Sequence, residues 1–338
     1  MEENKKPPSE LRFDLVSKNW VVVASGRAKR PESFKKKKKK KPLQDKNCPF
    51  RTLANQEQPV LMTYKGKEVP FGSKKWTLAV IPNKFPAVVP SLKLNERIEG
   101  GIYEKMDAVG FHEVVITKSH SRHMADFKVN EVKEVFNAYR KRYLFLKKQK
   151  HVNHISIFHN QGEKAGASVN HPHSQIITTP LIDVDLLGAL SNSEKYFKKT
   201  NKCIYCKMSD WERKEKERVV FENKEFIALC PFASKSAFQI IITPKKHRPY
   251  FEKISEKEIT FLSEAFSSVM KKIKKGLGDP DYNFYLHSAP CDGKKHDYYH
   301  YHWTILPRTS TFAGFEIGTR MEILVVKPEK AAKYLREQ

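Results

Sequence analysis

The order of chemical features along this 338-residue chain repeats once, and the repetition limits the folds open to it. Each half has a cysteine-bearing segment, a strand ending near a histidine, a long helical segment and a His-x-His motif. The landmarks of the first half are Cys48, His120 and His171-Pro172-His173. Those of the second half are Cys203-x-x-Cys206, His247 and His300-Tyr301-His302. Because the intervals 120 to 171 and 247 to 300 are almost equally long, we interpret the chain as a duplication of one α+β unit.

Hydrophobic patterning predicts the same two units. Runs rich in β-branched residues, with the length of strands, lie at 20–24, 77–81, 113–117, 154–159, 175–178, 225–229, 238–243, 282–286 and 302–306. Long helices are expected at 129–148 and 256–276, each between two groups of strands, and a shorter one near 185–198. We therefore predict an α+β fold with two halves, residues 1–183 and 184–338, each an antiparallel β-sheet with a long helix.

Composition excludes several classes of protein. Hydrophobic residues make up 39% and charged residues 30%, which is typical of a globular chain rather than a disordered or fibrous one. No stretch approaches the roughly 20 consecutive apolar residues that span a bilayer. The first ten residues, MEENKKPPSE, are charged and have no apolar signal core, so we expect a cytoplasmic protein without a membrane partner.

The formal net charge of +25 predicts a polyanionic partner but does not identify it. One lysine run, Lys35 to Lys41, lies in a low-complexity tract at 32–46 that repulsion among the lysines should keep extended or mobile. Nucleic acid, a phosphorylated metabolite and a merely solvated basic surface all agree with this charge. Because no RNP-type aromatic motif or C2H2 finger accompanies it, nucleic acid is the less favoured partner.

The five cysteines are an odd number in a chain without a secretory signal, which favours metal ligation or free thiols over disulfides. In the second half, four side chains can form the Cys2His2 tetrahedron that zinc prefers: Cys203, Cys206, His247 and His300. A redox-active cysteine pair and a site without metal are the alternatives.

The equivalent positions of the first half hold Cys48, His120 and His171, but Arg51 stands where a second cysteine would be. A guanidinium cannot ligate zinc. The first half therefore has either a three-ligand site, completed by water or by His123, or a polar packing cluster in place of the metal.

The segment His171-Pro-His173-Ser-Gln175 places three polar side chains on one face of a strand. It follows a loop with glycines, Asn160-Gln-Gly162 to Gly166-Ala-Ser168, which can approach a phosphate closely. One imidazole can be held by a metal or a carbonyl group while the other attacks phosphorus. The alternative is a pair of hydrogen-bonded histidines on a buried strand.

Together these motifs resemble the galactose-1-phosphate uridylyltransferase family, a branch of the histidine-triad superfamily. The resemblance runs from about Leu11 to Leu335. Its further points are Trp20-Val-Val-Val, Arg27-Ala-Lys-Arg30-Pro31, Cys48-Pro-Phe, Pro82-Asn83-Lys-Phe-Pro, Tyr282-Asn-Phe, Tyr299-His-Tyr-His302 and Ala313-Gly-Phe-Glu316.

The resemblance implies that His173 takes a nucleoside monophosphate from a nucleotide sugar, such as UDP-glucose or UDP-galactose, and passes it to a second hexose 1-phosphate. Gln175 would then hydrogen-bond a phosphoryl oxygen, and zinc would be the metal. The family's substrate-binding positions fall on Arg27, Arg30, Asn83, Asn160, Gly166 and Ser168. A homodimer is also expected by resemblance.

Three positions depart from the repeat or the family. Arg51 interrupts the first metal site, and Ala189 replaces a glutamate that holds a second metal in some members. Thr304 stands where a glutamine would follow His302, so we expect only one competent half. Two other functions stay open: an ADP-glucose phosphorylase of the same fold, and a catalytically silent relative that binds nucleic acid or other anions.

Overall fold

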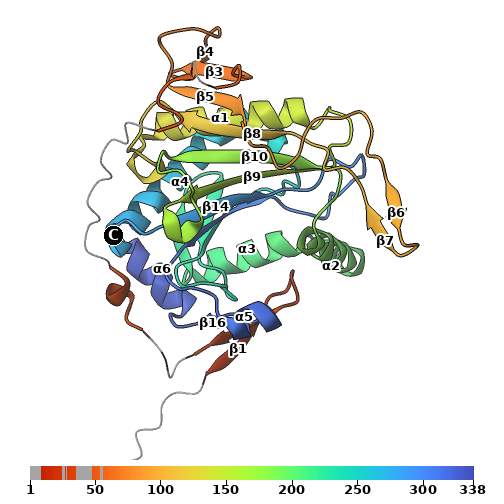
Figure 1. The fold of residues 1–338 in the computed structure, drawn as a ribbon. Helices are drawn as coiled ribbons and strands as arrows, with labels where there is room; N and C mark the ends of the chain where they lie inside the picture. Colours follow the sequence, from red (N-terminus) through yellow and green to blue (C-terminus); the bar gives the residue numbers. More distant parts are fainter. Residues whose placement is uncertain (1–8, 25–26, 28, 36–47, 54–55) are drawn as a thin grey trace, which may run out of the picture.

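The computed structural model describes residues 9–24, 27, 29–35, 48–53 and 56–338 (Figure 1). Most of the lysine run falls outside these residues, and Pro31–Phe34 form a short 3-10 turn just before it. Between residues 56 and 338 no helix has the length and apolar character needed to cross a membrane.

One antiparallel sheet of eleven strands runs through the molecule (Figure 1). The first half contributes β3 (Leu61–Tyr64), β4 (Lys67–Glu68), β5 (Leu78–Pro82), β8 (His112–Thr117), β9 (His154–Gln161) and β10 (His173–Thr179). The second half contributes β11 (Val219–Glu222), β12 (Phe226–Leu229), β13 (Ile240–Pro244), β14 (Tyr282–His287) and β15 (His302–Pro307). The nine predicted strands and three predicted helices are confirmed, with small shifts at their ends.

The strand order shows the duplication directly. From the outer edge inward, the first half runs β4-β3-β5-β8-β10-β9, and the second half runs β11-β12-β13-β15-β14, so that five strands of each half correspond and β4 is an addition at the edge of the first half. The two inner strands, β9 and β14, pair with each other, with Asn160 opposite Asn283. The predicted antiparallel sheet of each half is thus present, and the two are joined edge to edge into one continuous sheet.

The main core lies between one face of this sheet and the helices α1 (Val129–Leu146) and α4 (Glu256–Leu277). Its centre is aromatic and fully buried, with edge-to-face contacts among Phe136, Phe266 and Trp303. A capping box begins α4, because Ser255 Oγ accepts from the Glu258 N–H while the Glu258 carboxylate accepts from the Ser255 N–H. Gly278, in the left-handed region at φ 72°, ends it.

The other face of the sheet carries the His-x-His motifs. In the second half it is approached by α3 (Ile204–Glu215), whose Tyr205 ring lies 5.5 Å from that of His302. The remaining elements are α2 (Val184–Thr200), α5 (Gly314–Thr319), α6 (Pro328–Arg336), the small sheet of β1 (Glu10–Phe13), β2 (Trp20–Val23) and β16 (Ile323–Leu324), and the hairpin of β6 (Arg97–Glu99) and β7 (Tyr103–Lys105). The short 3-10 turns η4 (Met124–Asp126), η5 (Glu163–Ala165) and η6 (Phe251–Lys253) complete the described fold.

Candidate functional site

His173 is the first residue of β10 and has a fixed ring orientation. Its Nδ1 lies 2.8 Å from the carbonyl oxygen of His171, to which it donates, so the lone pair of the neutral ring is on Nε2. The residue is only 9% exposed, and burial lowers the pKa of His173 below its ordinary value of 6.5. The ring of Phe50 lies 5.5 Å away. His173 is thus a neutral imidazole with an oriented nucleophilic nitrogen.

A row of polar side chains crosses the neighbouring strands on the same face. Gln175, two residues after His173, has its Oε1 atom 2.8 Å from Nε2 of His112 on β8. The same Nε2 lies 3.0 Å from Nδ2 of Asn83, directly after β5. On the other side of β10, Asn160 near the end of β9 has its Oδ1 atom 2.8 Å from Nδ2 of Asn283 on β14.

The loop between β9 and β10 has a backbone that requires glycine. Gly162 has φ 83°, and a side chain there would place its Cβ 2.2 Å from the Asp281 carboxylate. The N–H of Lys164 donates to that carboxylate at 2.9 Å, and the Arg308 guanidinium donates to the Lys164 carbonyl oxygen at 3.2 Å. Residues of the second half therefore hold this loop, on which the exposed Gly166 and Ser168 lie, beside the His173 strand.

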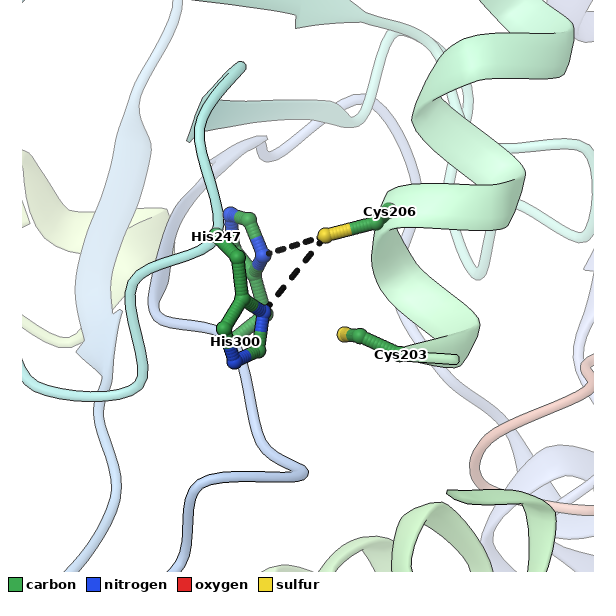
Figure 2. A group of neighbouring side chains, drawn as sticks. All are labelled: Cys203, Cys206, His247 and His300. Carbon is green, nitrogen blue, oxygen red and sulfur yellow. Dashed lines mark hydrogen bonds between the residues drawn. The ribbon is translucent and has the colours of Figure 1, made fainter. Parts of the chain in front are cut away.

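The second half brings its four predicted metal ligands together (Figure 2). Cys203 caps α3 and Cys206 lies in its first turn, while His247 follows β13 and His300 precedes β15. One donor atom from each residue lies within 4.8 Å of all the others. The segment that carries the two cysteines is the start of helix α3.

Hydrogen bonds orient both histidines of this cluster. His247 Nε2 donates to the Asp297 carbonyl oxygen at 2.6 Å, and His300 Nε2 donates to that of Pro244 at 3.0 Å. Their Nδ1 lone pairs therefore face Cys206 Sγ, at 3.5 and 3.4 Å (Figure 2). Hydrogen bonding with Cys206 is the largest cause that lowers the pKa of the Cys203 thiol. Two sulfurs and two imidazoles, each imidazole oriented by a carbonyl oxygen at its other nitrogen, form a donor set that fits a tetrahedral metal ion.

Among the residues that the structure describes, the first half brings together three donors, from Cys48, His120 and His171. His171 Nδ1 lies 3.1 Å from His120 Nδ1 and 3.6 Å from Cys48 Sγ, while its Nε2 donates to the Thr117 carbonyl oxygen. Arg51 lines a pocket beside His120. His123 does not join this cluster, since its ring nitrogens lie 3.2 Å from the Tyr282 hydroxyl and 3.1 Å from the Asp279 carboxylate.

The second half repeats the nucleophile geometry with different side chains around the ring. His302 Nδ1 donates to the His300 carbonyl oxygen at 3.2 Å, as His173 does to that of His171. The ring of His287, its partner across β14 and β15, stacks on it at 4.5 Å. Burial lowers the pKa of His302 to about 4. Tyr205 also packs against its ring, and Thr304 lies two residues on, where the first half has the Gln175 amide.

Two of the predicted site residues lie apart from the side chains around His173. Arg27 and Arg30 are exposed on the segment after β2, and among the described residues neither contacts the side chains around His173.

Three residues of the two sites were not predicted from the sequence: His112, Asn283 and His287. His112 begins β8 one residue before the predicted strand, and its alternation with Val114 is the signal that could have revealed it.

Comparison with protein families matches both halves. Residues 1–182 match the model for the galactose-1-phosphate uridyl transferase N-terminal domain, and residues 189–337 match its C-terminal domain. The chain is 35% identical to an ADP-glucose phosphorylase of Arabidopsis thaliana, over 99% of this chain and 94% of that protein. It is 25% identical to a galactose-1-phosphate uridylyltransferase of Thermotoga maritima, over 97% and 98% of the two chains.

Solved structures give the same result for the fold. A crystal structure of the Arabidopsis thaliana ADP-glucose phosphorylase with bound ADP-glucose superposes with a TM-score of 0.82. It is 32% identical and covers 98% of this chain and 99% of that one. A uridylyltransferase structure has a TM-score of 0.74 at 25% identity and covers 97% of each chain.

Proposed function

Because this chain belongs to the galactose-1-phosphate uridylyltransferase family, we propose that it moves a nucleoside monophosphate from a nucleotide sugar through a covalent bond to His173. The observation that carries the proposal is the His173 ring, whose Nδ1 is fixed to the His171 carbonyl oxygen so that Nε2 is free to attack. The catalytic unit is the half formed by residues 1–183, and residues 184–338 complete it.

The first displacement releases the sugar phosphate. His173 Nε2 attacks the α-phosphorus, the bond from that phosphorus to the bridging oxygen breaks, and the hexose 1-phosphate leaves with the electron pair. The Nδ1–H bond to the His171 carbonyl oxygen stabilises the positive charge that develops on the ring. Gln175 donates its amide to a phosphoryl oxygen, and the loop with Gly166 and Ser168 holds the phosphates. Asn83 holds the nucleoside. Arg27 and Arg30, which the resemblance places at the phosphates, lie apart from the side chains around His173 in this structure.

The second displacement regenerates His173 when an acceptor oxygen attacks the nucleotidyl-histidine. We favour ADP-glucose as donor and inorganic phosphate as acceptor, which gives ADP and glucose 1-phosphate. The support is the identity of 35% to an ADP-glucose phosphorylase, against 25% to a uridylyltransferase. The sequence alone placed UDP-glucose and a hexose 1-phosphate acceptor first. That exchange stays the second candidate, because both halves match models of the uridylyltransferase domains.

We propose zinc for the cluster of Cys203, Cys206, His247 and His300, whose donor set suits it. When bound there, zinc supplies cross-links between α3 and the two loops that carry the histidines. Cys48, His120 and His171 form a weaker site with one ligand fewer. With or without a metal ion at these three residues, the hydrogen bond to the Thr117 carbonyl oxygen orients the His171 ring.

The test is the intact mass of the protein after incubation with ADP-glucose, or with UDP-glucose, without an acceptor. We expect an adenylyl adduct on the wild type and none on His173→Ala. His302→Ala is the matched control, because it removes the second histidine of the other His-x-His motif and should leave the adduct unchanged. Release of the adduct by phosphate or by galactose 1-phosphate then identifies the acceptor.

Each outcome decides between the functions. A uridylyl adduct on His173 would move the assignment to the second candidate. An adduct that persists in His173→Ala would remove His173 from the mechanism. If neither donor labels the wild type and neither reaction turns over, the transferase proposal fails.

A further inference from the structure

His112 lies in the middle of the polar row that leads from Asn83 to Gln175. On the paired strands β8 and β10, Gln175 is opposite Val114 and His112 is opposite Ile177. His112 and Gln175 are therefore diagonal neighbours on the face that carries His173. The ring of His112 is half-buried, and its nitrogens both lie within hydrogen-bond distance of other groups.

The backbone determines which ring nitrogen of His112 carries the proton. The Ala87 N–H, which can only donate, points at His112 Nδ1 at 3.0 Å. Nδ1 must therefore keep its lone pair, and the neutral ring carries its proton on Nε2. This Nε2 lies 2.8 Å from Gln175 Oε1, an acceptor, so it donates to the Gln175 carbonyl group.

We propose that His112 is a positioning residue that selects one of the two orientations of the Gln175 amide. The oxygen and nitrogen ends of an amide have nearly the same shape, so packing alone does not distinguish them. Nε2–H of His112 points at Gln175 Oε1. In the opposite orientation the NH2 group of Gln175 would face this N–H, and two donors cannot form a hydrogen bond. The Gln175 NH2 group is therefore turned away from β8 and can donate to a phosphoryl oxygen on His173.

The same proton constrains Asn83. Its Oδ1 accepts from the Phe85 N–H at 2.9 Å, which turns its Nδ2 toward His112 Nε2, at 3.0 Å. Because the single proton of Nε2 is directed at Gln175, Asn83 must donate to another acceptor. The hydrogen bonds that start at the Ala87 N–H and fix the His112 proton thus determine both amides. They leave the NH2 groups of Gln175 and Asn83, on either side of the His112 ring, available to the ligand of this site.

The inference rests on the proposed function, and a double-mutant cycle tests it. We would measure the rate of adduct formation on His173 at saturating donor for His112→Phe, which keeps a ring without a donor, and for His112→Gln, which keeps an amide N–H near Nε2. We expect His112→Phe to slow the step 10- to 100-fold, and His112→Gln to stay within about 3-fold of the wild type. In the Gln175→Ala background, His112→Phe should cause no further loss.

An equal loss from His112→Phe in both backgrounds, or none in the wild-type background, would overturn the inference. The histidine nitrogens can also be observed by 15N NMR, with His112→Gln assigning the signal. We expect the Nε2–H tautomer, and an Nδ1–H tautomer would overturn the inference. Because this spectrum needs no turnover, it tests His112 even if neither donor labels His173 and the proposed function fails.

Discussion

Asn283, from the second half of the chain, donates its side-chain amide to Asn160 Oδ1 and to the Ala165 carbonyl oxygen, both at 2.8 Å. Asn160 and Ala165 flank the turn at Gly162, within the segment assigned to phosphate binding. Because Asn160 Oδ1 is already occupied by this bond, its NH2 group is the part left to face a ligand. A residue of the second half thus helps to position the loop beside His173 in the first half.

Replacing Asn283 with leucine should slow formation of the His173 adduct about 10- to 100-fold. The variant keeps the volume but leaves Asn160 Oδ1 and the Ala165 carbonyl oxygen without their donor, so the loop loses its fixed position. Pre-steady-state mass measurement at saturating donor checks the rate. Asn192→Leu is the control, because its amide makes a similar bond, to the Val16 carbonyl oxygen, away from the site. Equal rates for wild type and Asn283→Leu would show that this bond has no part in the reaction.

The cluster of Cys203, Cys206, His247 and His300 should bind one zinc ion per chain tightly. Cys206→Ser should lose that equivalent in metal analysis and unfold at a lower temperature, since a bound ion stabilises only the folded chain. The control is Cys291→Ser, a cysteine whose Sγ donates to the Val152 carbonyl oxygen outside both clusters. Unchanged metal content in Cys206→Ser would exclude this cluster as the metal site.

Arg51→Cys should convert the three-donor cluster of the first half into a four-donor site. The N–H of residue 51 donates to the Cys48 carbonyl oxygen at 3.1 Å, which gives a turn that can bring a second thiolate to the cluster. We expect the variant to retain one more zinc equivalent than the wild type after dialysis against a mild chelator. Arg51→Ser removes the guanidinium without adding a thiolate and should gain nothing. Equal zinc contents for Arg51→Cys and Arg51→Ser would contradict the prediction.

The strands and the two clusters of candidate metal ligands were predictable because they depend on local sequence signals and their repetition. Each of the nine predicted strands is a β-branched run, and residues 129–148 and 256–276 have clear helical periodicity. The ligands of the second cluster were found because the same spacing occurs twice. Ile204–Glu215 was missed as a helix, since its few buried residues, Ile204, Ser209 and Glu212, give little apolar periodicity.

The contacts that define the site depend on pairings that the sequence does not contain. His112 reaches Gln175 only because β8 and β10 pair in one register. Asn283 reaches Asn160 only because the inner strands of the two halves join edge to edge. The stacking of His287 on His302 also depends on register, because β14 places His287 opposite it. A repeat in the sequence predicts two similar units, but not the way in which they meet.

Acid should destabilise the protein partly through His159, which lies behind the site. Its ring stacks on that of Phe284 at 4.8 Å, and its nitrogens lie 3.0 Å from Ser174 Oγ and 3.3 Å from Gln161 Oε1. Burial lowers the pKa of His159 from an ordinary 6.5 to about 3. Between these values only the unfolded chain takes up the proton, so the free energy of unfolding falls as the pH falls, by about 1.4 kcal/mol per pH unit for this group.

His159→Phe keeps the stacked ring and removes the titrating group. At pH 8 it should be about 1–2 kcal/mol less stable than the wild type, because the two hydrogen bonds are lost. Between pH 6 and pH 4 the wild type should lose stability faster than the variant, by about 1.4 kcal/mol per pH unit, so that the variant is the more stable of the two at pH 4. Urea unfolding of both proteins at pH 8, 6, 5 and 4 measures this difference in the free energy of unfolding. A difference that stays constant over this range would mean that His159 does not titrate as a buried neutral ring.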